Sequence, residues 1–316
     1  MRSILSRKST ILSFFALLLF TFFCETSYSQ SGWTSVVSST KNGLRSIFFA
    51  DANTGYAAGG LGTIIKTVDG GNKWTTLSSG TNNRLHQIYF VNANTGYAVG
   101  LLGSVIKTID GGSRWNKLNT GIQDQLYAVY FINAETGFVA GGKGGLLKTI
   151  DGGANWTGIA SGSANWIKSV CFSNENTGYY TSGQNIFKTT NSGANWAMLS
   201  AGSQNPLEII ICRDNNIFTV GDYGTILKSI DGGSSWEAQK SGVTNWMQSI
   251  SFPDNNTGYA VGNKATILKT SDGGSTWVKQ AAPVTEDLFS VFFIDSNTGF
   301  ASGENGTLIK TVTGGN

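Results

Sequence analysis

The sequence predicts an all-β fold, a seven-bladed β-propeller of four-stranded antiparallel blades, over residues 30–316. Two observations lead to this prediction. A short phrase, first seen at residues 67–74 (TVDGGNKW), occurs seven times at intervals of 40 or 41 residues. Each interval also holds four short runs of β-forming residues separated by Gly and Asn turns. A fixed period of this length indicates a repeat architecture, and four strands per repeat are typical of propeller blades.

The first 29 residues lie outside the repeat and have the features of a signal peptide. A basic segment at residues 2–8 precedes an apolar run at residues 11–23, and residues 27–29 (SYS) have the small-x-small form of a cleavage site. The apolar run is too short to cross a bilayer. We therefore expect export to the periplasm, the cell surface or the extracellular medium, with no membrane span after cleavage.

One repeat, residues 85–118, shows how a blade is built. Residues 85–91 alternate and are rich in β-formers, and shorter runs follow at residues 97–100, 104–109 and 115–118. Turn residues separate all four runs, so the repeat predicts a four-stranded meander. A lone meander cannot bury both of its faces, whereas radial stacking lets each sheet cover its neighbour.

The two ends of the repeat region complement each other. Trp33 precedes Trp74 by 41 residues, which is the repeat period, yet no phrase precedes Trp33. The last phrase begins at Thr311 and stops at Asn316, before its Trp. We therefore predict that a strand near residues 33–37 is the outer strand of the last blade and closes the ring.

Charge argues against one class of partner. The chain has 22 Lys+Arg and 19 Asp+Glu, and the net charge of +3 is carried largely by the leader. Nucleic-acid binding through a basic face is therefore not expected.

Two cysteines remain after the leader, Cys171 and Cys212. Aligned on the repeat, they occupy adjacent strand positions on opposite faces, in neighbouring blades. We therefore expect two buried thiols and no disulfide between them.

The acidic position of the repeated phrase is expected to be structural. A carboxylate before two glycines can accept hydrogen bonds from the N–H groups of its own turn, and glycine tolerates the positive φ needed there. Seven equivalent positions argue against a single catalytic centre, and no metal site is expected. The positions are Asp69, Asp110, Asp151, Asn191, Asp231 and Asp272, with Thr313 in the last copy.

A lysine lies three residues before the acidic position in every repeat. We expect each stem to pack along its blade while the ammonium stays in water. The alternative, a ring of lysines that attracts an anionic surface, remains open. These residues are Lys66, Lys107, Lys148, Lys188, Lys228, Lys269 and Lys310.

The phrase matches Ser/Thr-x-Asp-x-Gly-x-x-Trp, the Asp-box of the bacterial neuraminidase repeat. This repeat also occurs in sortilin-type receptors, xyloglucanases and the photosystem II stability/assembly factor family. The chain most resembles the last family, whose repeats run like residues 94–100 (NTGYAVG) and 103–108 (GSVIKT) followed by the phrase. The resemblance covers residues 33–316 and implies a propeller with an assembly-factor-like role. The phrase alone implies no catalytic residue and no cofactor.

Positions that vary among the repeats indicate a candidate site. They flank a nearly constant Leu at the start of each inner strand, on the face opposite the Asp-boxes. There they mix aromatic, basic and acidic side chains around the central axis, as ligand sites do. Trp166 and Trp246, which break the repeat phase, are candidate anchors for a sugar ring or a partner protein. The other candidates are Arg45, Arg84, His86, Tyr127, Lys168, Glu208, Asp287 and Phe289, with Lys143, Tyr223 and Lys264 from nearby turns.

The sequence therefore predicts an exported, non-catalytic, monomeric propeller that binds a protein or a glycan through this variable face, without a cofactor. The alternative is a glycoside hydrolase, sialidase-like or active on β-glucan, that uses the same face. A β-glucan-active enzyme would need a carboxylate pair, for which Glu208 with Asp287, or Asp222 with Glu304, are available. A sialidase-like enzyme would need an arginine triad, a tyrosine nucleophile with a glutamate, and an acid/base aspartate. The blades carry no long insertions, which favours binding over catalysis.

Overall fold

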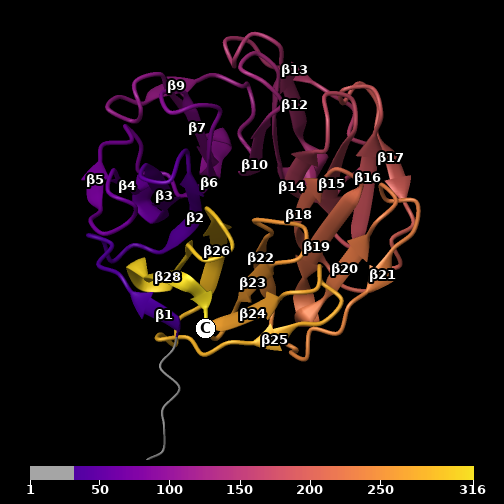
Figure 1. The fold of residues 1–316 in the computed structure, drawn as a ribbon. Helices are drawn as coiled ribbons and strands as arrows, with labels where there is room; N and C mark the ends of the chain where they lie inside the picture. The colour runs from indigo at the N-terminus through magenta and orange to yellow at the C-terminus, as the bar shows by residue number, and fades with distance from the viewer. Residues whose placement is uncertain (1–31) are drawn as a thin grey trace, which may run out of the picture. The chain divides into compact units, whose positions relative to one another are not determined.

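A computed structural model describes residues 32–316, so the predicted signal peptide at residues 1–29 lies outside the described residues. The described chain forms seven four-stranded antiparallel sheets around a ring (Figure 1). Six sheets keep their strands in sequence order, and the inner strands of neighbouring sheets contact each other all the way round. The predicted seven-bladed propeller is confirmed.

Each blade contributes strands in four roles. The inner strands are β2 (Leu44–Phe49), β6 (Leu85–Phe90), β10 (Leu126–Phe131), β14 (Ile167–Phe172), β18 (Leu207–Arg213), β22 (Met247–Ser251) and β26 (Leu288–Phe293). The second strands are β3 (Gly55–Gly59), β7 (Gly96–Gly100), β11 (Gly137–Gly141), β15 (Gly178–Ser182), β19 (Asn216–Gly221), β23 (Gly258–Gly262) and β27 (Gly299–Gly303). Nearly every residue of the second strands is buried, because neighbouring blades cover both faces.

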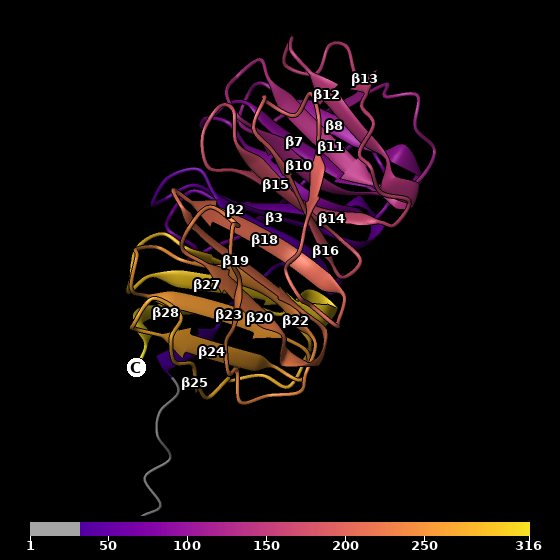
Figure 2. The ribbon, with the colours of Figure 1, turned by 90° about the vertical axis from the view of Figure 1, so that its right-hand side faces the viewer.

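The third strands are β4 (Ile64–Thr67), β8 (Val105–Thr108), β12 (Leu146–Thr149), β16 (Asn185–Thr189), β20 (Ile226–Ser229), β24 (Thr266–Thr270) and β28 (Leu308–Gly315). The outer strands are β5 (Thr75–Leu77), β9 (Asn116–Leu118), β13 (Thr157–Gly158), β17 (Ala197–Leu199), β21 (Glu237–Ala238), β25 (Val278–Lys279) and β1 (Gly32–Ser35). Blades 1 to 6 begin at β2, β6, β10, β14, β18 and β22, and blade 7 consists of β26–β28 with β1. Figure 2 shows strands β18–β20 of blade 5 side by side.

Short 3-10 turns join the second and third strands in five blades: η1 (Gly60–Gly62), η2 (Leu101–Gly103), η3 (Gly142–Gly144), η4 (Asp222–Gly224) and η5 (Glu304–Gly306). In residues 32–316, no helix is long and apolar enough to cross a membrane.

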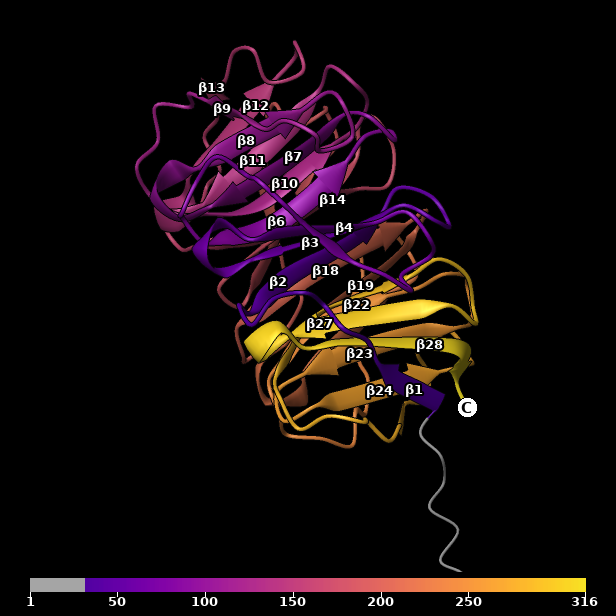
Figure 3. The ribbon, with the colours of Figure 1, turned by 90° about the vertical axis from the view of Figure 1, so that its left-hand side faces the viewer.

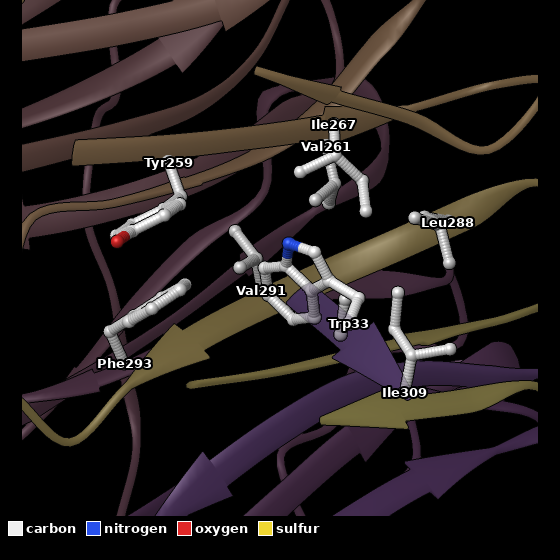
Figure 4. Close-up of a cluster of buried hydrophobic side chains, with 9 residues drawn as sticks. Trp33, Tyr259, Val261, Ile267, Leu288, Val291, Phe293 and Ile309 are labelled. Carbon is white, nitrogen blue, oxygen red and sulfur yellow. The ribbon is translucent and has the colours of Figure 1, made fainter. Parts of the chain in front are cut away.

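The N-terminal strand closes the ring, as predicted. β1 pairs antiparallel with β28 through Thr34↔Lys310 and Ser35↔Ile309, and the two strands lie together in Figure 3. Trp33 is only 1% exposed, and its indole lies edge-on to Phe293, with ring centroids 5.7 Å apart. Figure 4 shows this indole among aliphatic side chains of blades 6 and 7.

The Asp-box residues hold their own turns. Asp69 Oδ1 accepts hydrogen bonds from the backbone N–H of Asn72 (3.0 Å) and Lys73 (2.9 Å) and from the Thr67 hydroxyl (2.8 Å). Asn191 replaces the carboxylate in blade 4 and accepts the corresponding bond from Asn195 N–H. The pKa of Asp151 falls to about 2 because the backbone N–H and side chain of Asn155 and the Thr149 hydroxyl donate to its carboxylate.

The lysines that precede each Asp-box were expected to keep their ammonium groups in water. That expectation was wrong, because most of these ammonium groups donate hydrogen bonds to protein. Lys66 Nζ donates to the Gly111 carbonyl at 2.8 Å, and Tyr56 Oη donates to the same oxygen at 2.9 Å. That carbonyl belongs to the Asp-box turn of the next blade. The arrangement recurs where Lys107 Nζ donates to the Gly152 carbonyl at 2.7 Å. These lysines therefore join neighbouring blades.

A disulfide joins Cys171 to Cys212, so the expectation of two free thiols was wrong. The two positions do lie on opposite faces of their own sheets. In a radial stack, however, opposite faces of neighbouring sheets are the ones that meet. The equivalent pair in blades 2 and 3 is Tyr89 and Phe131, where Tyr89 Oη donates to the Phe131 carbonyl at 3.1 Å.

Candidate functional site

All seven blades line a cavity of about 530 Å³ on the central axis. Its wall consists of one residue from each inner strand. This is the second residue of the strand, directly after the Leu, Ile or Met with which the strand begins. These seven wall residues are Arg45, His86, Tyr127, Lys168, Glu208, Gln248 and Phe289.

A β-bulge places each wall residue. The pairing of every inner strand with its second strand shifts register at this point, for example between Leu44 and Ser46 and between Leu85 and Gln87. A bulge leaves its extra residue unpaired and re-aims the side chain. The shift recurs in all seven blades, so one local irregularity turns seven side chains toward the axis.

Neighbouring wall residues contact one another around much of the ring. The Arg45 guanidinium lies 3.8 Å from the centre of the Phe289 ring. His86 and Tyr127 have ring centroids 4.7 Å apart. Lys168 Nζ lies 4.4 Å from the centre of the Tyr127 ring and 3.2 Å from a Glu208 carboxylate oxygen. These contacts fix the wall before any ligand enters.

A layer of serine and glutamine side chains lies below the wall, at the next position along five of the seven inner strands. Ser46 Oγ accepts the backbone N–H of Ile88, Ser290 Oγ accepts that of Ile47, and Ser249 Oγ accepts that of Val291, all at 3.2 Å. Gln87 Oε1 accepts Val129 N–H at 2.7 Å. Each bond crosses to a neighbouring blade, so this layer both lines the cavity and joins the blades.

Aromatic rings form the floor beneath this layer. Phe48 lies between Tyr89 and Phe292, with ring centroids 5.3 and 5.4 Å away, and all three line the cavity. Tyr130 continues the arc beside Tyr89 at 5.5 Å. The cavity therefore has polar walls above an apolar base.

Burial dominates the electrostatics of the wall. Desolvation, together with the nearby charges of Arg45, Arg84 and Lys168, lowers the pKa of His86 to about 4. Its imidazole is therefore neutral at physiological pH. Burial also raises the pKa of Glu208, although the Lys168 ammonium opposes that shift. The Glu208 side chain is 14% exposed and its Lys168 partner is 21% exposed.

Most of the sequence-predicted site residues meet in this cavity. Its lining includes nine of them: Arg45, Arg84, His86, Tyr127, Lys168, Glu208, Trp246, Asp287 and Phe289. Trp166 lies beside the wall, with its ring 5.7 Å from that of Tyr127 and the side chain 49% exposed.

Besides Trp166, three predicted residues do not line the cavity. Lys143 forms an exposed ion pair with Asp124 at 3.3 Å. Tyr223 is 72% exposed and borders a separate groove at blade 5. Lys264 contributes a backbone N–H to Asp287 Oδ1 at 2.8 Å. These residues lie in the turns after the second strands, outside the central cavity.

Sequence reasoning missed the serine and glutamine layer and the aromatic floor. Their signal lay one and three positions beyond the variable slots, where small polar and then aromatic residues recur along the inner strands. Glu208 and Asp287, one carboxylate pair of the hydrolase alternative, do not share a hydrogen-bond partner. Glu208 forms an ion pair with Lys168, and Asp287 accepts the backbone N–H of Lys264. Within residues 32–316, no group of three or more His, Cys, Asp or Glu side chains is placed to hold a metal ion.

Comparison with known proteins gives one family and many similar folds. The family model described as photosynthesis system II assembly factor YCF48 matches residues 25–120, 72–202, 110–241, 199–279 and 244–312. No curated protein matches the chain.

Three solved structures share the fold at low sequence identity. A structure of YCF48 bound to D1 peptide is 19% identical with a TM-score of 0.76, over 89% of this chain and 95% of that one. YCF48 from Cyanidioschyzon merolae is 19% identical with a TM-score of 0.75, over 88% and 98%. The GH74 xyloglucanase from Xanthomonas campestris is 13% identical with a TM-score of 0.75, over 90% of this chain and 54% of that one. At these identities the structural likeness shows the fold alone.

Proposed function

Because the chain belongs to the photosystem II assembly factor YCF48 family, we propose that it is an exported, non-catalytic propeller that binds a protein segment in its central cavity. The observation that carries this proposal is the preformed cavity, with seven wall residues aimed inward by bulges above an aromatic floor. One structural relative is described as bound to D1 peptide, so a propeller of this kind accommodates a peptide.

The rim supplies candidate anchors for that segment. Trp246 lines the cavity and is 41% exposed, and Trp166 stands beside Tyr127 with about half of its surface free. Tryptophan is enriched among the residues that dominate protein interfaces. Wall residues that are already packed against one another lose little conformational freedom on binding, which favours affinity.

Export is supported by two independent features. The leader has the features of a signal peptide, and the Cys171–Cys212 disulfide suits an oxidising compartment. We propose that the mature chain acts as a monomer in the periplasm, at the cell surface or outside the cell. Fractionation of cells that express the full chain, with an antibody to the propeller, tests this assignment. Retention in the cytoplasm would contradict it.

The binding proposal is tested with an array of overlapping peptides from the exported proteins of the source organism. Wild type should bind a defined subset, and Trp246→Ala should weaken that binding at least about 10-fold, as expected for an anchor worth more than about 1.4 kcal/mol. Lys117→Ala, on the outer strand of blade 2, is the matched control and should bind like wild type. Absence of any peptide binding would refute the proposal.

Two further assays distinguish the alternatives. A glycan array separates a carbohydrate partner from a protein partner. Fluorogenic sialosides and β-glucans test the hydrolase alternative, and turnover that Glu208→Gln abolishes would overturn the non-catalytic assignment.

A further inference from the structure

We infer that the central cavity contains a carboxylate subsite, formed by Arg45, Gln87 and the hydroxyl groups of Ser46, Ser249 and Ser290. The inference rests on the proposed function in one respect, because it names the chemical group through which a partner would enter the cavity. Its geometry stands on hydrogen bonds within the protein.

The serine hydroxyls are presented as donors. Ser46, Ser249 and Ser290 each accept a backbone N–H from the neighbouring blade at 3.2 Å. A hydroxyl that accepts such a bond retains one O–H proton to donate. In residues 32–316 no protein acceptor takes any of these three protons, and all three serines line the cavity. The protons are therefore available to a ligand.

Gln87 extends the same arrangement by one blade. Its Oε1 is held by Val129 N–H at 2.7 Å, which settles the orientation of the amide. The amide nitrogen then carries two N–H donors, and within the described chain neither has a protein acceptor. Gln87 and the three serines come from blades 6, 7, 1 and 2, which are consecutive around the ring. Together they form a continuous arc of donors.

Arg45 lies directly above this arc and carries the positive charge. Its guanidinium stacks on Phe289 at 3.8 Å, so one face is covered while the N–H edge stays open. No hydrogen bond or ion pair joins that edge to another described residue. A stacked guanidinium with a free edge matches the planar geometry of a carboxylate.

At the level of this layer, blades 3 to 5 offer no comparable donors. The equivalent positions in blades 3 and 5 are Ala128 and Ile209, and Ser169 in blade 4 already donates its proton to the Ile210 carbonyl at 3.2 Å. Lys168 is committed to Glu208. A ligand is therefore oriented, with its oxygen acceptors toward blades 6 to 2.

Charge selects a monoanion over a phosphate. Asp287 and Glu304 also line the cavity and interact with the Arg45 charge. Two nearby carboxylates disfavour a dianion, whereas one carboxylate can be met by Arg45 and the neutral donors. Sugar hydroxyls need acceptors as well as donors, and the arc supplies mainly donors. A carboxylate, at a chain end or on an Asp or Glu side chain, is the group that fits.

The test uses ¹⁵N-labelled mature protein and two matched small probes, N-acetylalanine and N-acetylalaninamide. The acid should shift the Gln87 side-chain amide and Arg45 Nε–H signals in a saturable way, and the neutral amide should not at the same concentrations. Arg45→Met should weaken binding of the acid at least about 10-fold, since charge-assisted hydrogen bonds are the strong ones. Lys117→Ala is the control and should respond like wild type.

The outcomes separate this inference from the proposed function. Equal shifts with both probes, or none with the acid, would overturn the subsite even if the peptide array shows binding. A saturable response to the acid alone would establish the subsite even if no peptide binds. With array-selected peptides, loss of binding on C-terminal amidation identifies the chain end as the source, whereas loss only on Asp→Asn or Glu→Gln replacement identifies a side chain.

Discussion

Reduction of the Cys171–Cys212 disulfide should destabilise the propeller by an amount that follows from the length of chain it closes. The two cysteines are 41 residues apart, one blade repeat. In the loop-entropy treatment, a cross-link over about 40 residues removes unfolded-state entropy worth about 4 kcal/mol at 25 °C. Cys171 is also buried, 6% exposed in an apolar cluster, and Cys212 is partly buried against that cluster. Reduction would therefore leave two thiols at a packed blade junction.

Urea unfolding followed by tryptophan fluorescence, with and without a non-thiol reductant, measures this effect. Reduced wild type is the best comparison with oxidised wild type, because it keeps the same atoms apart from two hydrogens. We expect a loss of about 4 kcal/mol. The variant Cys171→Ser/Cys212→Ser should be insensitive to the reductant, which controls for effects elsewhere. A difference below about 1 kcal/mol between oxidised and reduced wild type would refute the entropic reasoning.

Three further predictions concern the wall, the closure and the Asp-box. Burial holds the pKa of His86 near 4, below its unfolded value of about 6.5. The free energy of unfolding should therefore fall by on the order of 3 kcal/mol as the pH drops from about 6.5 to about 4. The variant His86→Gln should lose that part of the pH dependence in denaturant melts, and a pH profile identical to that of wild type would contradict the prediction. Trp33→Ala should lower the free energy of unfolding by about 3–5 kcal/mol, because the indole is 1% exposed. Trp196→Ala should lower it less in the same urea titration, because that ring is only partly buried. Equal losses of stability in the two variants would argue against Trp33 as the residue that closes the ring. Asp151→Asn should leave the melting temperature nearly unchanged, because Asn191 accepts the corresponding turn hydrogen bond in blade 4. Asp151→Ala should lower the melting temperature, because it leaves turn N–H groups without an acceptor. Equal melting temperatures for the two variants in calorimetry would show that the side chain of residue 151 does not hold the turn.

The fold was predictable because the same pattern of strands, turns and Asp-box occurs seven times in the sequence. Each Asp-box marks the turn before an outer strand, and the phase of Trp33 against the last box gave the closure through β1 and β28. A single blade would not have supported this inference, since short strands and glycine turns occur in many all-β folds. The repeat also located the wall positions, because variation against a constant frame stands out.

What the sequence did not reveal depends on contacts between blades. The disulfide was missed because the faces of Cys171 and Cys212 were compared within a blade, while the stack brings the facing surfaces of two blades together. The role of Lys66 was missed because its acceptor is a backbone carbonyl 45 residues away, which leaves no mark in the sequence. The bulge at Arg45 was equally hidden, since a register shift is a property of the strand pair and not of one residue.

Closure through β1 also sets the order of events when the protein folds. The hydrogen bond from Thr34 to the Lys310 carbonyl joins residues 276 positions apart. The first strand made must therefore wait until nearly all of the chain has been synthesised before it finds its partner. Contacts of such long range form late and slowly. In the completed chain, the edge of β28 is unpaired until β1 reaches it, and the β1 strand of a second molecule can occupy it. At high concentration, we expect strand-exchanged dimers as the characteristic misassembled form of this propeller.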